Sequence, residues 1–128
     1  LFRIINSALK TGKIQYKGDI ESMREYIHVE DAAHASVSVL DESYKNESIV
    51  LTGQEPMRVS DMLKTMAEIL GYAKDSIEFT EDCYEAHYVR TPYAYQPKIG
   101  KKYIPPMHVD FGQGLLQIIT EIDQKNNS

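Results

Sequence analysis

Short strand-like segments alternate along this sequence with longer segments in which apolar residues recur at the spacing of a helix. This alternation constrains the fold most, because helices with one apolar face must cover a sheet or one another. Between residues 81 and 106 the periodicity fails, and four prolines break any helix there. The sequence therefore predicts the α/β class: a small mixed α/β lobe of about four helices with short strands. The predicted helical segments are 2–9, 32–40, 62–70 and 112–124, and the strand-like segments are 14–16, 26–29, 48–52 and 76–80.

A chain of 128 residues has the size of one domain. We expect residues 1–128 to form a single lobe that contains an irregular loop over 81–106. Short strands under four helices give a thin core for a free-standing domain, so part of the apolar surface is expected to face something else. The chain starts inside a helical pattern at Leu1 without a preceding cap, which favours a truncated chain.

The composition excludes several classes of protein. Fourteen basic and nineteen acidic residues give a formal net charge of −5, and no stretch has the basic character of a nucleic-acid-binding face. The apolar runs are far too short to span a membrane. Cys83 is the only cysteine, so the chain can form neither an internal disulfide nor a multi-thiolate zinc site. We expect no nucleic-acid or membrane partner and a reducing, cytoplasmic location.

The motifs of several catalytic and cofactor sites are absent from the sequence. A dinucleotide or triphosphate site needs a glycine-rich turn between a strand and a helix, so that backbone amides can approach phosphates. Only Gly112-Gln113-Gly114 resembles part of such a turn, and a flexible helix start is the simpler interpretation. No Gly-x-Ser-x-Gly motif is present, and Cys83 lies in no activating motif. We expect no catalytic residue and no bound cofactor in this chain.

A run of histidines and acidic residues, His28, Glu30, Asp31 and His34, superficially resembles a metal site. Only Asp31 and His34 have the spacing that places two ligands on one face of a helix. Asp31 stands where a carboxylate would cap the following helix. We therefore predict structural roles for His28 and Asp31, and no metal site.

The aromatic residues form a skewed set of nine tyrosines, three phenylalanines and no tryptophan. Five tyrosines lie in the irregular stretch, near His87, Arg90 and Lys98. Aromatic and cationic side chains on a loop suit a polar ligand with a phosphate or a planar ring. Packing at the edge of the core explains the same tyrosines at least as well, so both interpretations stay open. The five are Tyr84, Tyr88, Tyr93, Tyr95 and Tyr103.

One segment resembles a known family. Residues 24–33, Arg-Glu-Tyr-Ile-His-Val-Glu-Asp-Ala-Ala, are similar to the Arg-Asp-Phe/Tyr-Ile-His-Val-Asp-Asp motif of extended short-chain dehydrogenases/reductases, the NAD-dependent nucleotide-sugar epimerases and dehydratases. The helix, strand and glycine before it also resemble the family pattern, as do Leu-Thr-Gly at 51–53 and Val-Ser at 59–60. The match covers residues 1–80 well. The segments 91–98 and 110–116 are similar to a subgroup that acts in surface-polysaccharide sugar pathways.

The resemblance implies that the chain is the C-terminal, substrate-binding lobe of such an enzyme. In the family, an N-terminal Rossmann domain carries the glycine-rich cofactor loop and the catalytic Tyr-x-x-x-Lys pair, and no tyrosine here has a lysine four residues on. The lobe alone is therefore expected to be inactive, with NAD(P) bound mainly by the absent domain. The parent enzyme is expected to be a homodimer, and epimerase, dehydratase and reductase all remain possible for its reaction.

The resemblance also assigns substrate-binding residues. Arg24 matches the motif arginine that binds the pyrophosphate of the sugar nucleotide, since a guanidinium holds phosphate oxygens bidentately. A surface ion pair with Glu21 or Glu25 is the alternative for Arg24. Tyr16 matches the strand residue that faces the nucleotide base, and core packing is its alternative.

A second arginine and a rival function stay open. The usual Arg-x-Gly-Asp pattern for a second phosphate-binding arginine is absent, so Arg90 is the candidate for that role, with Lys98 behind it. The rival to the enzyme lobe is a stand-alone, non-enzymatic α/β module that binds a phosphorylated ligand or a protein partner. Binding of nucleotide-linked sugars would separate these two hypotheses.

Overall fold

The structure is a computed structural model, and it describes residues 1–53, 55–80 and 100–128. Helices and short strands alternate along these residues, which confirms the predicted mixed α/β class. The helices are α1 (Phe2–Thr11), α2 (Val29–Ser38), α3 (Val59–Leu70) and α4 (Phe111–Asn126), with single helical turns η1 (Glu42–Tyr44) and η2 (Lys74–Ser76). The strands are β1 (Ile14–Lys17), β2 (Met23–Glu25), β3 (Ile49–Leu51), β4 (Pro56–Arg58), β5 (Ile77–Thr80) and β6 (Lys101–Tyr103).

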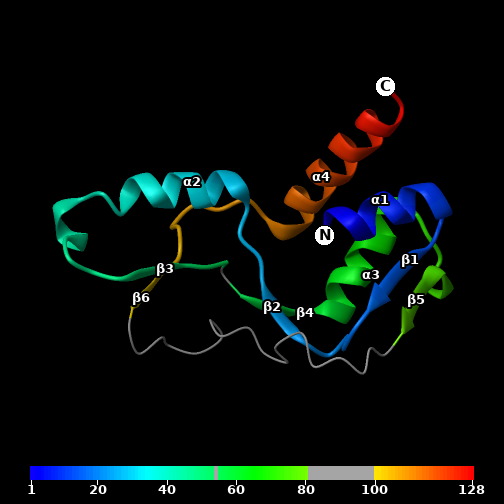
Figure 1. Cartoon of the computed structure of the whole chain (residues 1–128), viewed down its shortest axis with the longest axis horizontal. Coiled ribbons are helices and arrows are strands. Elements are labelled where there is room, and N and C mark those ends of the chain that lie inside the picture. Colours follow the sequence, from blue (N-terminus) through cyan, green and yellow to red (C-terminus); the bar gives the residue numbers. More distant parts are fainter. Residues whose placement is uncertain (54, 81–99) are drawn as a thin grey trace.

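The strands pair in twos. Within the described ranges, β1 runs parallel to β5, β2 runs antiparallel to β4, and β3 runs parallel to β6. Figure 1 shows β1 and β5 in one half of the molecule with α1, α3 and α4, whereas α2, β3 and β6 lie in the other half. The ribbon of β2 and β4 lies between the two halves (Figure 1). Arg24, the motif arginine, therefore sits on the element that joins them.

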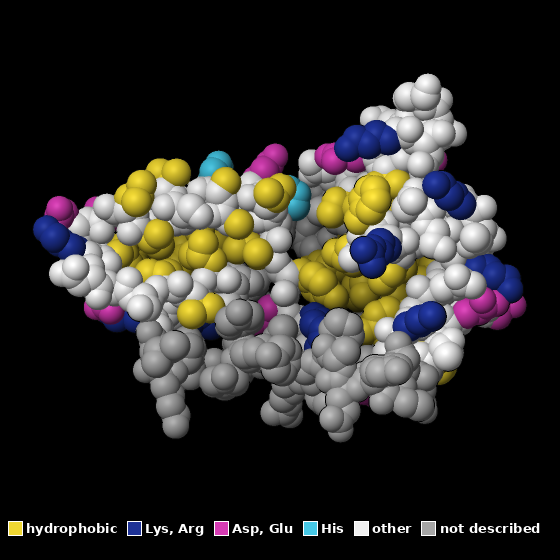
Figure 2. Space-filling model, in the orientation of Figure 1, with side chains coloured by type: hydrophobic (Ala, Val, Ile, Leu, Met, Phe, Trp, Pro, Cys, Tyr) yellow, Lys and Arg dark blue, Asp and Glu magenta, His cyan; other side chains and the backbone are white. Residues whose placement is uncertain are grey.

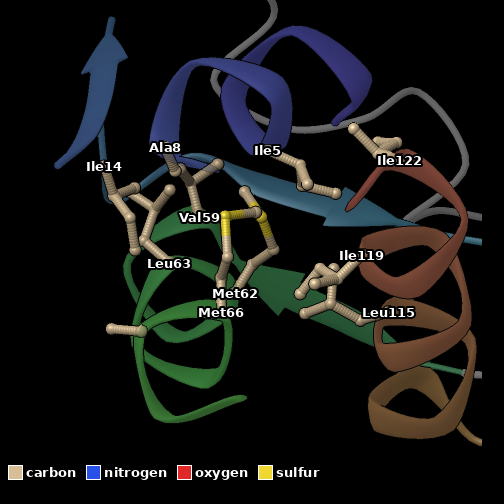
Figure 3. Packing of buried hydrophobic residues seen from close by; sticks show 11 residues of the cluster. Ile5, Ala8, Ile14, Val59, Met62, Leu63, Met66, Leu115, Ile119 and Ile122 are labelled. Carbon is tan, nitrogen blue, oxygen red and sulfur yellow. The ribbon is translucent and has the colours of Figure 1, made fainter. Parts of the chain in front are cut away.

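The hydrophobic core belongs to the half that holds three helices. Figure 3 shows Met62 and Met66 of α3 in the space between α1 and α4, with Ile5 and Leu115 on either side. These side chains are at most 2% exposed, and full burial of each stabilises the fold by about 1.5–3 kcal/mol. The amphipathic spacing in the sequence predicted this arrangement, because each helix turns one apolar face inward.

The other half leaves much apolar surface uncovered. On α2 only Asp31 and Ala35 are buried, while Val29 and Val37 of this helix are 75% and 69% exposed, and Leu40, just after it, is 80% exposed. Figure 2 shows hydrophobic side chains gathered over this half of the face in view. A monomeric protein rarely exposes a contiguous apolar surface of this kind without a partner for it.

The strand predicted over 26–29 is wrong. The strand in this region is β2, which lies three residues earlier and pairs with β4 so that Arg24 faces Met57. Residue Val29 already belongs to α2. The sequence did not indicate β4, because a three-residue strand that begins with Pro56 has no periodicity to detect.

Two further boundaries differ from the expectations. The helix predicted to follow a Ser60 cap starts at Val59 and has no side-chain cap; the Val59 and Ser60 amides donate instead to the carbonyls of Ser22 and Ile20. Strand β6 lies in the stretch where periodicity fails. It forms through its pairing with β3, which the local sequence does not indicate. The C-terminal helix begins at Phe111. None of the described helices is long and apolar enough to cross a membrane.

Candidate functional site

Strand β2 positions the motif arginine. The Arg24 guanidinium is partly buried, and its Nη1 donates a 2.8 Å hydrogen bond to the carbonyl of Met23. Both acidic residues considered as its ion-pair partners bind other cations: Glu21 lies 3.4 Å from Arg58, and Glu25 lies 2.9 Å from Lys102. The alternative of a pair with Glu21 or Glu25 is thus not the arrangement found.

Arg24 lies on β2, Tyr26 directly follows this strand, and Tyr16 lies on β1. Burial raises the pKa of Tyr26, the Arg24 guanidinium opposes that rise, and the Tyr16 hydroxyl adds to it. We call Tyr16, Arg24 and Tyr26 the arginine–tyrosine cluster. A guanidinium and two phenols offer charge, hydrogen-bond donors and flat apolar faces.

Tyr16 is held by the turn that follows β1. Gly18 has a φ of +125°, and a Cβ built there would lie 3.4 Å from the Tyr16 hydroxyl oxygen, so the tyrosine ring lies against this turn. The Gly18 amide donates to the carbonyl of Thr80 at 3.1 Å, which ties the turn to β5. The same ring also packs against the hydrophobic core. Core packing, the alternative considered for Tyr16, is thus present.

Gly53 lies very close to the backbone of Tyr26. A Cβ at Gly53 would lie 1.9 Å from the Tyr26 carbonyl oxygen, a distance that no side chain tolerates. Gly53 ends the segment after β3, so this contact presses that segment against the end of β2. The Leu-Thr-Gly resemblance was the only signal of this contact in the sequence. Its position beside Tyr26 was not predicted.

The structural roles of His28 and Asp31 differ from those expected. His28, rather than Asp31, caps α2: its Nδ1 accepts a hydrogen bond from the Glu30 amide at 3.3 Å. The Asp31 carboxylate, which is 7% exposed, accepts the Val109 amide at 2.8 Å and so joins α2 to the segment before α4. The prediction of Asp31 as the cap is wrong, because its position in the first turn points its side chain toward that segment.

Among the described helices, α2, α3 and α4 have hydrogen-bond partners for backbone amides at their starts. On α4 the Asp110 carboxylate accepts the amides of Gly112 and Gln113 at 2.9 and 3.2 Å. The first amides of α2 and α3 are engaged as described above. Gly114 lies inside α4, where a Cβ would be 3.1 Å from the His28 ring, so this glycine permits close packing of α4 on His28. These ends do not fit the pyrophosphate of a dinucleotide.

A cavity of about 450 Å³ lies between the starts of α2 and α4 and the Thr52-Gly53 segment. Of the three cluster residues, Tyr26 lines this cavity. Most of the lining is apolar, including Ile27, Met57 and Phe111. Such a cavity suits an apolar or aromatic group better than a diphosphate. Arg24 therefore remains the phosphate candidate.

The remaining predictions divide between described and undescribed residues. Arg90, Lys98 and four of the five loop tyrosines lie outside the described residues. The fifth, Tyr103, packs edge to face on Tyr44 with ring centroids 5.9 Å apart, which is the packing alternative for that residue. Among the residues that the structure describes, no group of three or more histidines, cysteines and acidic residues is placed to hold a metal ion.

Comparison with known proteins addresses the resemblance directly. Residues 1–52 match the model of the family described as NAD dependent epimerase/dehydratase. This range includes the arginine–tyrosine cluster. The resemblance to the epimerase/dehydratase family is confirmed. No curated protein matches the chain.

Solved structures of epimerase/dehydratase-type enzymes share the fold. A dTDP-glucose 4,6-dehydratase from Bacillus anthracis in complex with NAD superposes with a TM-score of 0.71 at 21% identity over 99% of this chain. A UDP-glucuronic acid 4-epimerase from Bacillus cereus in complex with NAD gives 0.70 at 16% identity over 97% of the chain. A GDP-L-fucose synthetase from Naegleria fowleri bound to NADP gives 0.69 at 14% identity over the whole chain.

The chain spans well under half of these enzymes. It covers 40% of the dehydratase, 39% of the epimerase and 39% of the synthetase. At these identities the superpositions establish the fold of the described residues and no particular reaction.

Proposed function

We propose that residues 1–128 form the part of an NAD-dependent epimerase/dehydratase that binds a nucleoside-diphosphate sugar. The arginine–tyrosine cluster carries this proposal, because its guanidinium and two phenols lie within residues 1–52, the range that matches the family model, and Arg24 acts on Tyr26 through its charge. The enzyme would act in the synthesis of sugars for surface polysaccharides, as the resemblance of segments 91–98 and 110–116 implies. Its location would be the cytoplasm.

Arg24 would hold the diphosphate. A guanidinium stays charged at every accessible pH and offers two parallel N–H groups to phosphate oxygens. The hydrogen bond from Nη1 to the Met23 carbonyl orients the group, so less side-chain entropy is lost when a ligand binds. The amides at the starts of α2 and α4 already have side-chain partners.

The chain would contribute binding and orientation rather than chemistry. Its helix starts do not fit a dinucleotide, and the sequence has no Tyr-x-x-x-Lys pair. We therefore assign NAD(P) and the catalytic residues to a Rossmann domain of a longer protein. Binding energy from the nucleotide, remote from the reacting sugar carbon, would be used to position that carbon.

The exposed apolar side chains of α2 would pack against that Rossmann domain. Val29, Val37 and Leu40 are each more than two-thirds exposed, and they lie in the half of the molecule with little core of its own. The complete enzyme would be a homodimer. In this proposal the 128-residue chain alone has no epimerase or dehydratase activity.

Calorimetric titration of the chain with dTDP-glucose and UDP-glucuronic acid tests the binding proposal. Arg24→Ala should weaken binding by about tenfold or more, since a hydrogen bond to a charged group contributes about 1.5–3 kcal/mol. Arg58→Ala is the matched control, because Arg58 lies on the paired strand and is 59% exposed. Equal affinity in wild type and Arg24→Ala would exclude the diphosphate role of Arg24.

The rival hypothesis predicts a different set of ligands. A stand-alone module for a phosphorylated ligand or a protein partner would bind neither nucleotide sugar, and Arg24→Ala would have no nucleotide affinity to change. Titration with NAD tests the assignment of the cofactor to another domain: saturable binding by residues 1–128 would contradict it.

A further inference from the structure

The strand that carries Arg24 is held at its first end by the backbone of α3. The Val59 amide donates to the Ser22 carbonyl at 3.0 Å, and the amide of the next residue donates to the Ile20 carbonyl at 2.9 Å. Ser22 directly precedes β2, and α3 supplies much of the hydrophobic core. This end of β2 is therefore attached to the half of the molecule that holds the core.

The other end of β2 is held by a side chain. Glu25, its last residue, is in register with Pro56 of β4, and a proline has no N–H group to donate to the neighbouring strand. The Glu25 carboxylate accepts a 2.9 Å hydrogen bond from Nζ of Lys102 on β6. Figure 1 shows β6 in the half of the molecule that also contains β3 and α2. The ion pair thus joins this end of β2 to that half.

This ion pair is largely buried. The side chains of Glu25 and Lys102 are 2% and 25% exposed, and Oε2 of Glu25 has no hydrogen-bond partner among the described residues. Buried charges lose their hydration, so apolar side chains of similar size often stabilise a fold as well or better. An ion pair adds direction, because a hydrogen bond between charged groups has a narrow range of distances and angles. The pair therefore suits the positioning of a strand.

Arg24 lies between the two attachments. It directly precedes Glu25, and its Nη1 donates a 2.8 Å hydrogen bond to the carbonyl of Met23, so the guanidinium is bound to β2 itself. A shift of β2 would move the guanidinium with it. Two parallel N–H groups that bind phosphate oxygens tolerate little displacement, because hydrogen bonds weaken steeply when their geometry is poor.

We propose that the Glu25–Lys102 ion pair is a positioning pair that holds the Arg24 guanidinium in place for a diphosphate. This inference rests on the proposed function, which places the diphosphate on Arg24. Successive side chains of a strand point to opposite faces, so the Glu25 carboxylate lies on the face away from the Arg24 side chain. The pair acts on Arg24 through the backbone of β2 and makes no contact with the ligand.

Replacing both charges with methionine tests this role. In Glu25→Met combined with Lys102→Met no charge is left buried alone, and the net charge stays at −5. The urea midpoint should be at or above that of wild type. Calorimetric titration should show that inorganic pyrophosphate binds about three- to tenfold more weakly, the cost of ordering one long side chain on binding. Lys102→Arg should keep the affinity of wild type, because a guanidinium preserves the ion pair.

NMR relaxation of the Arg24 Nε–H group gives a readout that needs no ligand. Its order parameter should fall in the double-methionine variant and stay at the wild-type value in Lys102→Arg. The matched control is Glu47→Met combined with Lys101→Met. This second pair also involves β6 and also leaves the net charge unchanged when it is removed, but its side chains are 38% and 64% exposed. Its loss should change neither the affinity nor the order parameter.

The results separate this proposal from the proposed function. If Arg24→Ala loses pyrophosphate binding but the double-methionine variant binds as tightly as wild type, the positioning role is excluded and the diphosphate site stands. Weaker binding with an unchanged order parameter would mean that Lys102 acts on the ligand directly, which also excludes positioning. Weaker binding together with a lower urea midpoint would show a structural role only and would overturn the proposal. If wild type binds no pyrophosphate, the proposed function and this inference fail together.

Discussion

Lys102 on β6 and Glu25 on β2 form a largely buried ion pair, with the lysine Nζ 2.9 Å from the Glu25 Oε1. The Glu25 side chain is 2% exposed and that of Lys102 is 25% exposed, whereas Oε2 of Glu25 is buried without a hydrogen-bond partner. The pair joins two strands that belong to different sheets, next to Arg24 in the sequence. It therefore helps to fix the position of β2 against the half of the molecule that holds α2, β3 and β6.

Removing the lysine should destabilise the fold strongly. Lys102→Met leaves the Glu25 carboxylate buried without its cation, and such a change costs about 3–5 kcal/mol. Lys101→Met is the control, since the neighbouring Lys101 is 64% exposed and its 2.7 Å ion pair with Glu47 is exposed as well, so less than about 1 kcal/mol should be lost. Urea unfolding of the two variants measures the difference. Equal losses would mean that burial of the Glu25 pair does not matter.

Gly53 should tolerate no side chain. In Gly53→Ala the new Cβ meets the Tyr26 carbonyl at 1.9 Å, so β3 and β2 must separate, at a cost of about 3 kcal/mol. Gly12→Ala is the comparison: Gly12 has a φ of +70° but no atom near its Cβ, so only the left-handed backbone costs about 1–2 kcal/mol. Thermal or urea unfolding should rank the two variants in this order. A Gly53→Ala protein as stable as Gly12→Ala would argue against the close approach.

Asp31 and Asp61 occupy the same position in the first turns of α2 and α3, but only Asp31 is shown to accept a distant amide. Asp31→Ala leaves the Val109 amide without its acceptor and should cost about 1–3 kcal/mol. Asp61→Ala, where the carboxylate is exposed beside Lys64, should cost less than about 1 kcal/mol. Hydrogen exchange at the Val109 amide should accelerate in the first variant only. Unchanged protection in Asp31→Ala would contradict the 2.8 Å bond.

The sequence predicted the helices better than the strands, for a physical reason. Four amphipathic patterns gave the four helices, since each pattern is local and repeats over several turns. Strands β2, β4 and β6 have three residues each and exist through partners far along the chain, so no local periodicity indicates them. The predicted caps also differ: Ser60 and Asp31 have suitable residue types, but the first amides of α3 donate to the distant carbonyls of Ser22 and Ile20, and His28, directly before α2, caps that helix.

Only those residues of the candidate site that resemble the family pattern were predicted from the sequence. Arg24 and Tyr16 were identified through the resemblance, and the structure brings both to Tyr26. The contact between Gly53 and Tyr26 and the pair of Glu25 with Lys102 join residues separated by 27 and 77 positions in the sequence. A single sequence carries no signal of such distances. These two relationships define the site's shape more than the motif does.

Tyr26 should make stability fall at alkaline pH. Burial raises its pKa in the folded chain above the value of about 10 in the unfolded chain. Its contribution is complete below the unfolded pKa and is lost as pH rises through the folded pKa, because the unfolded chain then ionises first. Tyr26→Phe should therefore lose less stability than wild type as the pH rises above about 10 in urea unfolding. Parallel losses in the two proteins would show that Tyr26 is not buried.

Replacing Arg24 should raise the pKa of Tyr26 even when no ligand is present. Arg24 lowers the pKa of Tyr26 against the effect of burial, so Arg24→Ala should raise it further. NMR titration of the Tyr26 ring carbon bonded to the hydroxyl measures this change site by site. Arg58→Ala should leave the Tyr26 titration as it is in wild type, because the Arg58 guanidinium lies beside the Glu21 carboxylate and does not contribute to the shift of the Tyr26 pKa. If Arg24→Ala titrated like wild type, the guanidinium would not lie beside Tyr26, and the arginine–tyrosine cluster on which the binding proposals rest would have to be abandoned.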